Sequence, residues 1–319
     1  MYPPSPTFVL RSSSSNSDFM LTGPTKHEHY TMRTCKPFSL LCSHYDGVRL
    51  SDGKKCVVKI ASRTCFPYWL SMFDQETDVF TRAKHKHMTE LLGSGLGVLM
   101  NSDTTGMLNY ACQTQYMAVE NPKWDLNDLL ANAGPLQDPF IRSVTRKLAK
   151  TIDHLHSRDI GFLTLSSDKI MFNEEGNLKL NGIGITVSLR NVPCYSGVFI
   201  QPFSAPEVYS ARYPFGFLPQ NAVVYSLGIN LLAMKIGKVP SIESFPYGCE
   251  EFQKETFWNT LQVLYQVSIE PSLRDLLKKM LLSNPMMRPT LTQVLNHPWL
   301  VEAGEDSSDH SGCETIAEL

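Results

Sequence analysis

Residues 154–180 read HLHSRDIGFLTLSSDKIMFNEEGNLKL, and the organisation of the chain is clearest around this stretch. It begins inside a segment whose apolar residues recur at helical spacing, at Ile141, Val144, Leu148, Ile152 and Leu155. That periodicity predicts an amphipathic helix over 140–156, which ends as the quoted stretch begins.

Helices dominate downstream of this stretch, and strands dominate upstream. Residues 223–236 are apolar almost all round, which predicts a buried central helix, and two more helices are predicted over 273–282 and 290–296. From Tyr30 to about Glu120, turn signals and one helical stretch (68–86) separate short apolar runs at 39–43, 55–61, 97–100 and 114–119. We therefore expect an α+β, bilobal fold, with a small β-rich lobe before a large helical lobe and a cleft between them.

The composition excludes several classes of function. The formal net charge of the 319-residue chain is -2, so no global basic field is available for nucleic acid or an anionic membrane. No apolar run of 18 residues and no secretory signal is evident, which predicts a cytoplasmic or nuclear protein. The eight cysteines form no C-x-x-C pair, so we expect reduced thiols and no metal site.

Both ends of the chain differ from its centre. Residues 1–27 are rich in Ser and Pro, and residues 301–319 are acidic and rich in Ser. Segments of this kind bury little apolar surface, so we expect two disordered tails. Between them we expect one domain over 28–300, divided into an N-lobe of about 28–120 and a C-lobe of about 121–300.

The ordered motifs of this central region resemble those of the eukaryotic serine/threonine protein kinase family over about 30–300. Residues 56–59 (CVVK) resemble the V-A-I-K strand, and 154–160 resemble the segment that precedes the catalytic loop. Residues 176–180 (GNLKL) resemble the strand before D-F-G. Three further matches are A-P-E at 205–207, YSLG at 225–228, and RPT with HPWL at 288–290 and 297–300. The last of these is similar to the calmodulin-dependent-kinase-like branch.

Two of the residues that the family uses for phosphoryl transfer are present. Lys59 matches the strand lysine and Glu76 the helix glutamate. The pair would grip a nucleotide phosphate, or it would be a salt bridge that pins the helix to the sheet. Both interpretations remain open at this point.

The other parts of the family's machinery are replaced. Thr164 occupies the position of the catalytic base, Ser166 that of the phosphate-facing lysine, and Lys169 that of a metal-binding asparagine. Gly182 occupies the position of the main metal ligand, so neither metal position offers a side-chain oxygen. The Gly-rich loop aligns with residues 34–39, where no glycine occurs.

The activation segment also departs from the family. Ser196 lies near the usual phosphorylation site, but Leu163 replaces the arginine that would bind the phosphate. Ile200 replaces the threonine whose hydroxyl braces the catalytic loop, and Val223 replaces the aspartate that supports the backbone of that loop. By contrast, Glu207 and Arg288 match a buried ion pair of the family's scaffold.

The chain keeps the residues that match the family's scaffold and lacks most of those that match its catalytic machinery. This is the pattern of a degenerate (pseudokinase) member of the family. The resemblance implies a scaffold or allosteric regulator that binds a protein partner, such as an active kinase or its substrate. The alternative is a kinase-class enzyme or nucleotide binder with metal-independent ATP contacts, in which the ammonium of Lys169 replaces a divalent ion. We expect no cofactor, although ATP without magnesium stays open. Val57 would crowd the adenine against Met171.

Overall fold

The computed structural model describes residues 19–34, 42–61, 67–102, 108–181, 186–189, 200–209, 216–240 and 250–301. The chain divides into one unit of residues 1–64 and 92–119 and a second unit of residues 65–91 and 120–319. The last of these divisions lies at the predicted boundary near residue 120, but residues 65–91, which we expected in the N-lobe, group with the second unit. Residues 65–91 join the second unit because Met88 bridges to Leu180 and the Thr89 amide donates to the Leu180 carbonyl oxygen.

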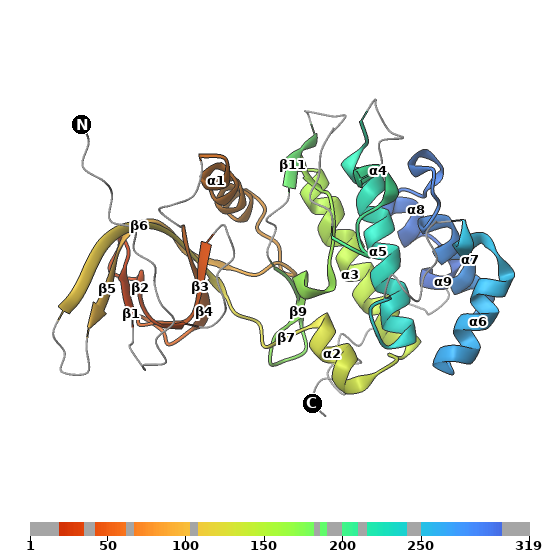
Figure 1. Ribbon diagram of the computed structural model, residues 1–319, viewed down its shortest axis with the longest axis horizontal. Coiled ribbons are helices and arrows are strands. Elements are labelled where there is room, and N and C mark those ends of the chain that lie inside the picture. The colour runs from red at the N-terminus through yellow and green to blue at the C-terminus, as the bar shows by residue number, and fades with distance from the viewer. Residues whose placement is uncertain are drawn as a thin grey trace. The chain divides into compact units, whose positions relative to one another are not determined.

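The first unit is a closed β-barrel of six strands (Figure 1). The strand order is β1-β2-β3-β4-β6-β5, and β1 pairs with both β2 and β5 in antiparallel register. The strands are β1 (Phe19–Thr22), β2 (His29–Thr34), β3 (Cys42–Arg49), β4 (Lys55–Ala61), β5 (Leu91–Ser102) and β6 (Leu108–Glu120). Closure leaves none of these strands as an open sheet edge.

Strand β1 corrects the expected N-terminal tail, whose boundary was placed at residue 27. Leu21 is fully buried and Met20 is exposed, which is the alternation of a strand with one face on a core. The Ser-rich composition of residues 11–17 conceals this short apolar run, because it dominates any average taken over the first 27 residues. Residues 1–18 lie outside the described part of the chain.

Aromatic and aliphatic side chains fill the interior of the barrel. The rings of Tyr30 and Tyr116 are both fully buried, and their centroids are 5.9 Å apart. The hydroxyl of Tyr30 donates to the carbonyl oxygen of Leu92 at 3.3 Å. Burial raises the pKa of the enclosed Cys56 thiol to about 12, so this cysteine stays protonated at neutral pH.

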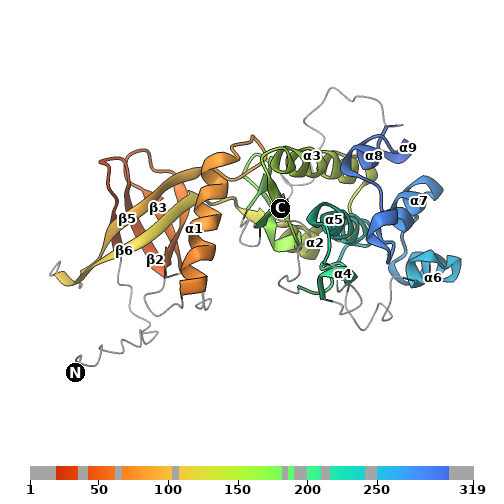
Figure 2. The same cartoon turned by 90° about the horizontal axis from the view of Figure 1, so that it is seen from above.

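The second unit is predominantly helical. Helix α5 is its centre: fifteen of its eighteen residues are buried, which confirms the prediction of a central helix that is apolar all round. Helix α3 runs beside α5 in both views (Figures 1 and 2). The helices are α1 (Pro67–Arg82), α2 (Leu126–Ala133), α3 (Asp138–His156), α4 (Pro206–Tyr209), α5 (Pro219–Ile236), α6 (Glu255–Tyr265), α7 (Pro271–Met280), α8 (Leu291–Leu295) and α9 (Pro298–Val301). Among the described helices, none combines the length and apolar character needed to cross a bilayer.

Two small sheets frame the loop at 163–169. One has the order β10-β9-β7, and the other pairs β11 with β8. Their strands are β7 (Trp124–Asp125), β8 (Ile160–Phe162), β9 (Ile170–Phe172), β10 (Leu178–Leu180) and β11 (Thr186–Ser188). Strand β8 leads into the loop and β9 leads out of it, after the 3₁₀ turn η1 (Ser167–Lys169). A fold that is β-rich first and helical second agrees with the predicted α+β class.

Candidate functional site

The loop 163–169 contains three of the positions singled out from the sequence. Thr164 and Ser166 are buried, with 5% and 4% of their surfaces exposed, whereas Lys169 is half-buried. Gly182 lies outside the described residues, as do Ser196 and residues 35–39 of the aligned Gly-rich loop. Thr34, which also aligns with that loop, ends strand β2.

The Thr164 side chain is held in a hydroxyl chain. Its Oγ1 lies 3.0 Å from the Oγ of Ser204, which is also buried. Ser204 Oγ in turn accepts a hydrogen bond of 2.8 Å from the backbone N–H of Ile200. Buried hydroxyls are stable only when they are hydrogen-bonded, so the chain fixes Thr164 against the segment that precedes α4.

This chain of hydrogen bonds corrects the expectation that the loop has lost the hydroxyl group that braces it. Ile200 does replace the threonine of the family, but Ser204, four residues later, supplies a hydroxyl to the same loop. The sequence contained no signal for it, since the contact joins residues forty positions apart.

The second half of the loop is organised around Asp168. Its carboxylate accepts a hydrogen bond from the Ser166 hydroxyl, and Oδ2 lies 2.8 Å from Lys169 Nζ. Partial desolvation tends to raise the pKa of Asp168, but attraction by Lys169 and hydrogen bonds from Lys169 and Ser166 outweigh it and lower the pKa. Asp168 is therefore a paired anion at neutral pH and is unsuited to accept a proton.

Helix α5 supports the backbone of the loop through Asn230, a residue that the sequence did not single out. Its Nδ2 donates at 2.8 Å to the Leu165 carbonyl oxygen and at 2.8 Å to the Ser226 carbonyl oxygen. Val223, which replaces the expected aspartate, is fully buried and apolar. The support predicted to be lost is therefore supplied two turns further along the same helix.

The loop fits a magnesium ion poorly. Mg²⁺ requires several oxygen ligands in near-octahedral geometry. Asp168 is the one carboxylate in the described loop 163–169, and it is engaged by the ammonium of Lys169 and the hydroxyl of Ser166. A metal ion bound there would have to displace that ammonium.

Asn181, the residue after strand β10, connects this loop to the strand, and Thr89 in turn contacts Asn181. Asn181 donates its backbone N–H to the Lys169 carbonyl oxygen at 2.8 Å and its side-chain amide to the sulfur of Met171 at 3.0 Å. Thr89 reaches the Asn181 side chain at 3.3 Å and the Leu180 carbonyl oxygen at 3.4 Å. The proposed adenine floor, Met171, is thus part of a packed polar network.

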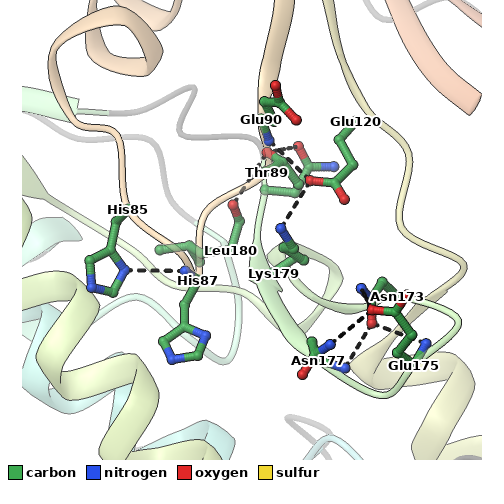
Figure 3. Close-up of polar contacts among 11 residues, drawn as sticks. His85, His87, Thr89, Glu90, Glu120, Asn173, Glu175, Asn177, Lys179 and Leu180 are labelled. Atoms are coloured by element: carbon green, nitrogen blue, oxygen red, sulfur yellow. Dashed lines mark hydrogen bonds and ion pairs between the residues drawn. The ribbon is translucent and has the colours of Figure 1, made fainter. Parts of the chain in front are cut away.

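Figure 3 shows the neighbouring contacts of β10. Lys179 Nζ lies 3.1 Å from Glu120 Oε2, which also accepts the Glu90 backbone N–H at 3.2 Å. In the turn that precedes β10, Asn173 Oδ1 accepts the backbone N–H of Asn177 at 2.8 Å. These bonds hold β10, and with it residue 181, in place.

The two retained machinery residues lie in different units. Lys59 is buried on β4 of the barrel, and Glu76 is buried on α1 of the helical unit. Val57 is half-buried on β4. Whether Lys59 and Glu76 pair stays a prediction from the resemblance.

The predicted scaffold ion pair is confirmed. Arg288 Nη1 and Nη2 contact the two carboxylate oxygens of Glu207 at 2.5 and 2.8 Å, and both side chains are fully buried. Arg288 also donates to the Leu282 carbonyl oxygen at 2.8 Å, and its guanidinium lies 5.1 Å from the centroid of the Tyr225 ring. Such a bidentate, saturated pair ties α4 to the segment before α8.

Comparison with known proteins agrees with this architecture. The sequence model described as "Protein kinase domain" matches residues 42–300. Sperm motility kinase 2B of Mus musculus is 26% identical over 257 residues, which cover 80% of this chain and 48% of that protein. Serine/threonine-protein kinase pim-2 of Danio rerio is 25% identical over 289 residues, which cover 88% of each chain. The chain spans about half the length of the sperm motility kinases that it matches.

Proposed function

The chain belongs to the protein kinase domain family, and on that premise we propose that it is a pseudokinase, a scaffold or allosteric regulator that acts by binding a protein partner without phosphoryl transfer. Its relatives are named kinases, so the proposal concerns this chain's own loop. Within the family, the ending at 297–300 suggests the calmodulin-dependent-kinase-like branch.

The state of Thr164 is the observation that carries the proposal. Phosphoryl transfer to a hydroxyl needs a carboxylate that accepts the hydroxyl proton. At this position the chain has a buried hydroxyl that is bonded to Ser204. A neutral hydroxyl in a closed hydrogen-bond chain neither accepts a proton near pH 7 nor orients a substrate.

The surroundings of Lys169 support the same conclusion. The ammonium is paired with Asp168 at 2.8 Å, so the loop neutralises its own charge. In a phosphoryl-transfer enzyme the metal ions neutralise charge on the phosphates. Because the charged groups of the loop pair with each other, they contribute little electrostatic stabilisation to a transition state.

The retained scaffold explains why the fold persists without the chemistry. The Glu207–Arg288 pair and the buried face of α5 hold the helical unit together independently of the loop. A rigid fold of this kind can present surfaces to an active kinase or to its substrate, which are the classes of partner that we propose. Binding of this kind needs no nucleotide.

A thermal-melt series of the full chain with ATP, ADP and magnesium, alone and combined, tests the proposal. We expect no shift in melting temperature with any of them, because a ligand stabilises a protein only when it binds the folded state. The Lys169→Asn variant serves as the matched comparison, since it restores an oxygen donor at that position.

The other outcomes distinguish the alternatives. A shift with ATP alone that is lost in Lys59→Met would favour a nucleotide binder with metal-independent contacts. A shift that requires magnesium would contradict the proposal, because it would show that metal ligands exist in this chain. All melting temperatures are measured on the same protein samples, and circular dichroism confirms that the variants are folded.

A further inference from the structure

A strongly basic surface lies on the helical unit, outside the loop described above. Two segments form it: residues 78–87, at the end of α1, and residues 146–159, in and after α3. The segments carry seven basic side chains, Arg82, Lys84, Lys86, Arg146, Lys147, Lys150 and Arg158, and three acidic ones, Asp78, Asp153 and Asp159. We refer to the seven residues as the basic surface.

Side-chain contacts join the two segments. The rings of His85 and His154 are 4.8 Å apart, and the Thr151 hydroxyl lies 3.3 Å from His85 Nδ1. Arg82 Nη1 reaches the carbonyl oxygen of Arg158 at 3.5 Å. Figure 3 shows His85 and His87 on the first segment, where the backbone N–H of His87 meets the His85 ring nitrogen. The seven cations therefore belong to one continuous region of this unit.

The basic residues of this surface outnumber its acidic residues by seven to three. Asp78 pairs with Arg82, and Asp159 accepts a hydrogen bond from Ser188. Among the residues that the structure describes, Lys84, Lys86 and Lys150 pair with no acidic side chain, and all three are exposed. Burial is the main cause that lowers the pKa of His87 to about 4, and the nearby charges of Lys86 and Lys147 lower it further.

One end of the basic surface lies where the described chain ends. Arg146 Nη2 donates at 2.5 Å to the carbonyl oxygen of Leu300, one residue before the end of α9. From Arg146, basic or titratable residues recur every fourth position along α3, at Lys150 and His154, and Arg158 follows two residues beyond the end of the helix. Residues four apart are neighbours on a helix surface, so Arg146, Lys150 and His154 form a stripe about 12 Å long that starts beside residue 300.

The segment that follows has the opposite charge. Residues 302–319 contain six acidic residues and neither lysine nor arginine; the six are Glu302, Glu305, Asp306, Asp309, Glu314 and Glu318. Eighteen residues span at most roughly 60 Å, so the segment is long enough to follow the whole stripe. Its first acidic residue lies two positions beyond Leu300.

We propose that the acidic segment 302–319 binds the basic surface of the same chain and thereby occludes it. The inference goes beyond the proposed function, because it assigns an interaction surface that a pseudokinase does not require. Surface ion pairs are individually weak, but a tethered segment has an effective concentration of about a millimolar, so several weak contacts suffice. The segment 302–319 would then compete with any acidic partner for binding to this surface.

Zero-length cross-linking of the full chain with a carbodiimide, followed by mass spectrometry, tests the contact directly. At low salt we expect peptides in the monomer band that join the acidic residues of 302–319 to Lys86, Lys147 or Lys150. These products should be lost at about 0.5 M NaCl, where the Debye length falls to a few ångströms. Their absence at low salt, or their presence only in a cross-linked dimer, would overturn the proposal.

A competition experiment on the full chain provides the second measurement. The six acidic residues are replaced by Gln or Asn, and the probe is a fluorescein-labelled poly-glutamate peptide. We expect the probe to bind this neutralised chain about tenfold more tightly than the parent, because the tethered competitor is gone. Equal binding to both chains would overturn the proposal and would favour an open surface for external acidic partners.

Paired lysine variants locate the effect. In the neutralised chain, Lys86→Gln with Lys150→Gln should remove the gain in probe affinity. The matched control, Lys26→Gln with Lys55→Gln, removes the same charge from exposed positions of the barrel unit and should leave the gain intact. If the two pairs behave alike, net charge rather than the basic surface explains the binding, and the proposal fails. Circular dichroism confirms that each variant is folded.

Discussion

The hydroxyl oxygens of Thr164 and Ser204 lie 3.0 Å apart, and both side chains are buried. The contact joins the loop between β8 and β9 to the segment before α4 and places a neutral hydrogen-bond chain at the position aligned with a catalytic base. Ser204 Oγ also accepts a hydrogen bond from the backbone N–H of Ile200, so this one hydroxyl contacts both Thr164 of the loop and the backbone of Ile200.

Ser204→Ala should destabilise the fold. The substitution leaves the Thr164 hydroxyl and the Ile200 N–H without their observed partner, and a buried unsatisfied group costs about 1–3 kcal/mol. Urea unfolding measures the loss. Ser157→Ala is the control, since Ser157 is exposed and exposed substitutions usually stay within about 0.5 kcal/mol. Equal stability of the two variants would show that the hydroxyl chain is not formed in solution.

Asn230→Ala should destabilise the helical unit by about 2–4 kcal/mol, because two buried carbonyl oxygens, of Leu165 and Ser226, lose their donor. Asn230→Asp should be at least as damaging, since a carboxylate cannot donate to either carbonyl and would be buried without a cation. Chemical unfolding of both variants checks this order. An Asp variant as stable as the parent would contradict the assigned role of the side-chain amide.

Glu207→Gln should cost about 3–5 kcal/mol, because it leaves the Arg288 guanidinium buried without its counter-ion. The double variant Glu207→Gln, Arg288→Met should recover part of the loss, since the unpaired charge is removed. A double-mutant cycle in urea measures the coupling. Additive effects in the cycle would contradict a direct bidentate pair.

Acid should destabilise the protein through His87. Burial, Lys86, Lys147 and His85 lower its pKa from the ordinary 6.5 to about 4 in the folded state. As the pH falls below about 6.5 the unfolded chain binds the proton first, so stability is full at neutral pH and declines towards pH 4. Melting temperatures across this range measure the decline. His87→Gln should flatten it in part, whereas His27→Gln, at an exposed position, should leave it unchanged.

The elements that local patterns predict well are those with strong periodicity or a conspicuous motif. The all-round apolar character of 223–236 predicts a buried helix, and α5 is one. The strand predicted over 55–61 is β4, with the same bounds. The match of Glu207 and Arg288 to the family predicts their ion pair, which the structure contains.

Features created by tertiary contact are the ones that the sequence leaves hidden. Strand β1 has four residues beside a Ser-rich stretch, and only its pairing with β2 and β5 makes it a strand. Ser204 and Asn230 support the loop from forty and sixty-five residues away, and nothing near them in the sequence marks that role. Losses at aligned positions were visible, but the replacements that compensate for them were not.

Transfer of phosphate from γ-labelled ATP tests the central claim most directly. The full chain is incubated with magnesium or manganese, with itself and a general protein substrate as acceptors, and Lys59→Met is run beside it to reveal contaminating kinases. We predict that any incorporation is the same for the parent and Lys59→Met. Incorporation by the parent that Lys59→Met abolishes would show that this chain transfers phosphate, and it would contradict the assignment as a pseudokinase.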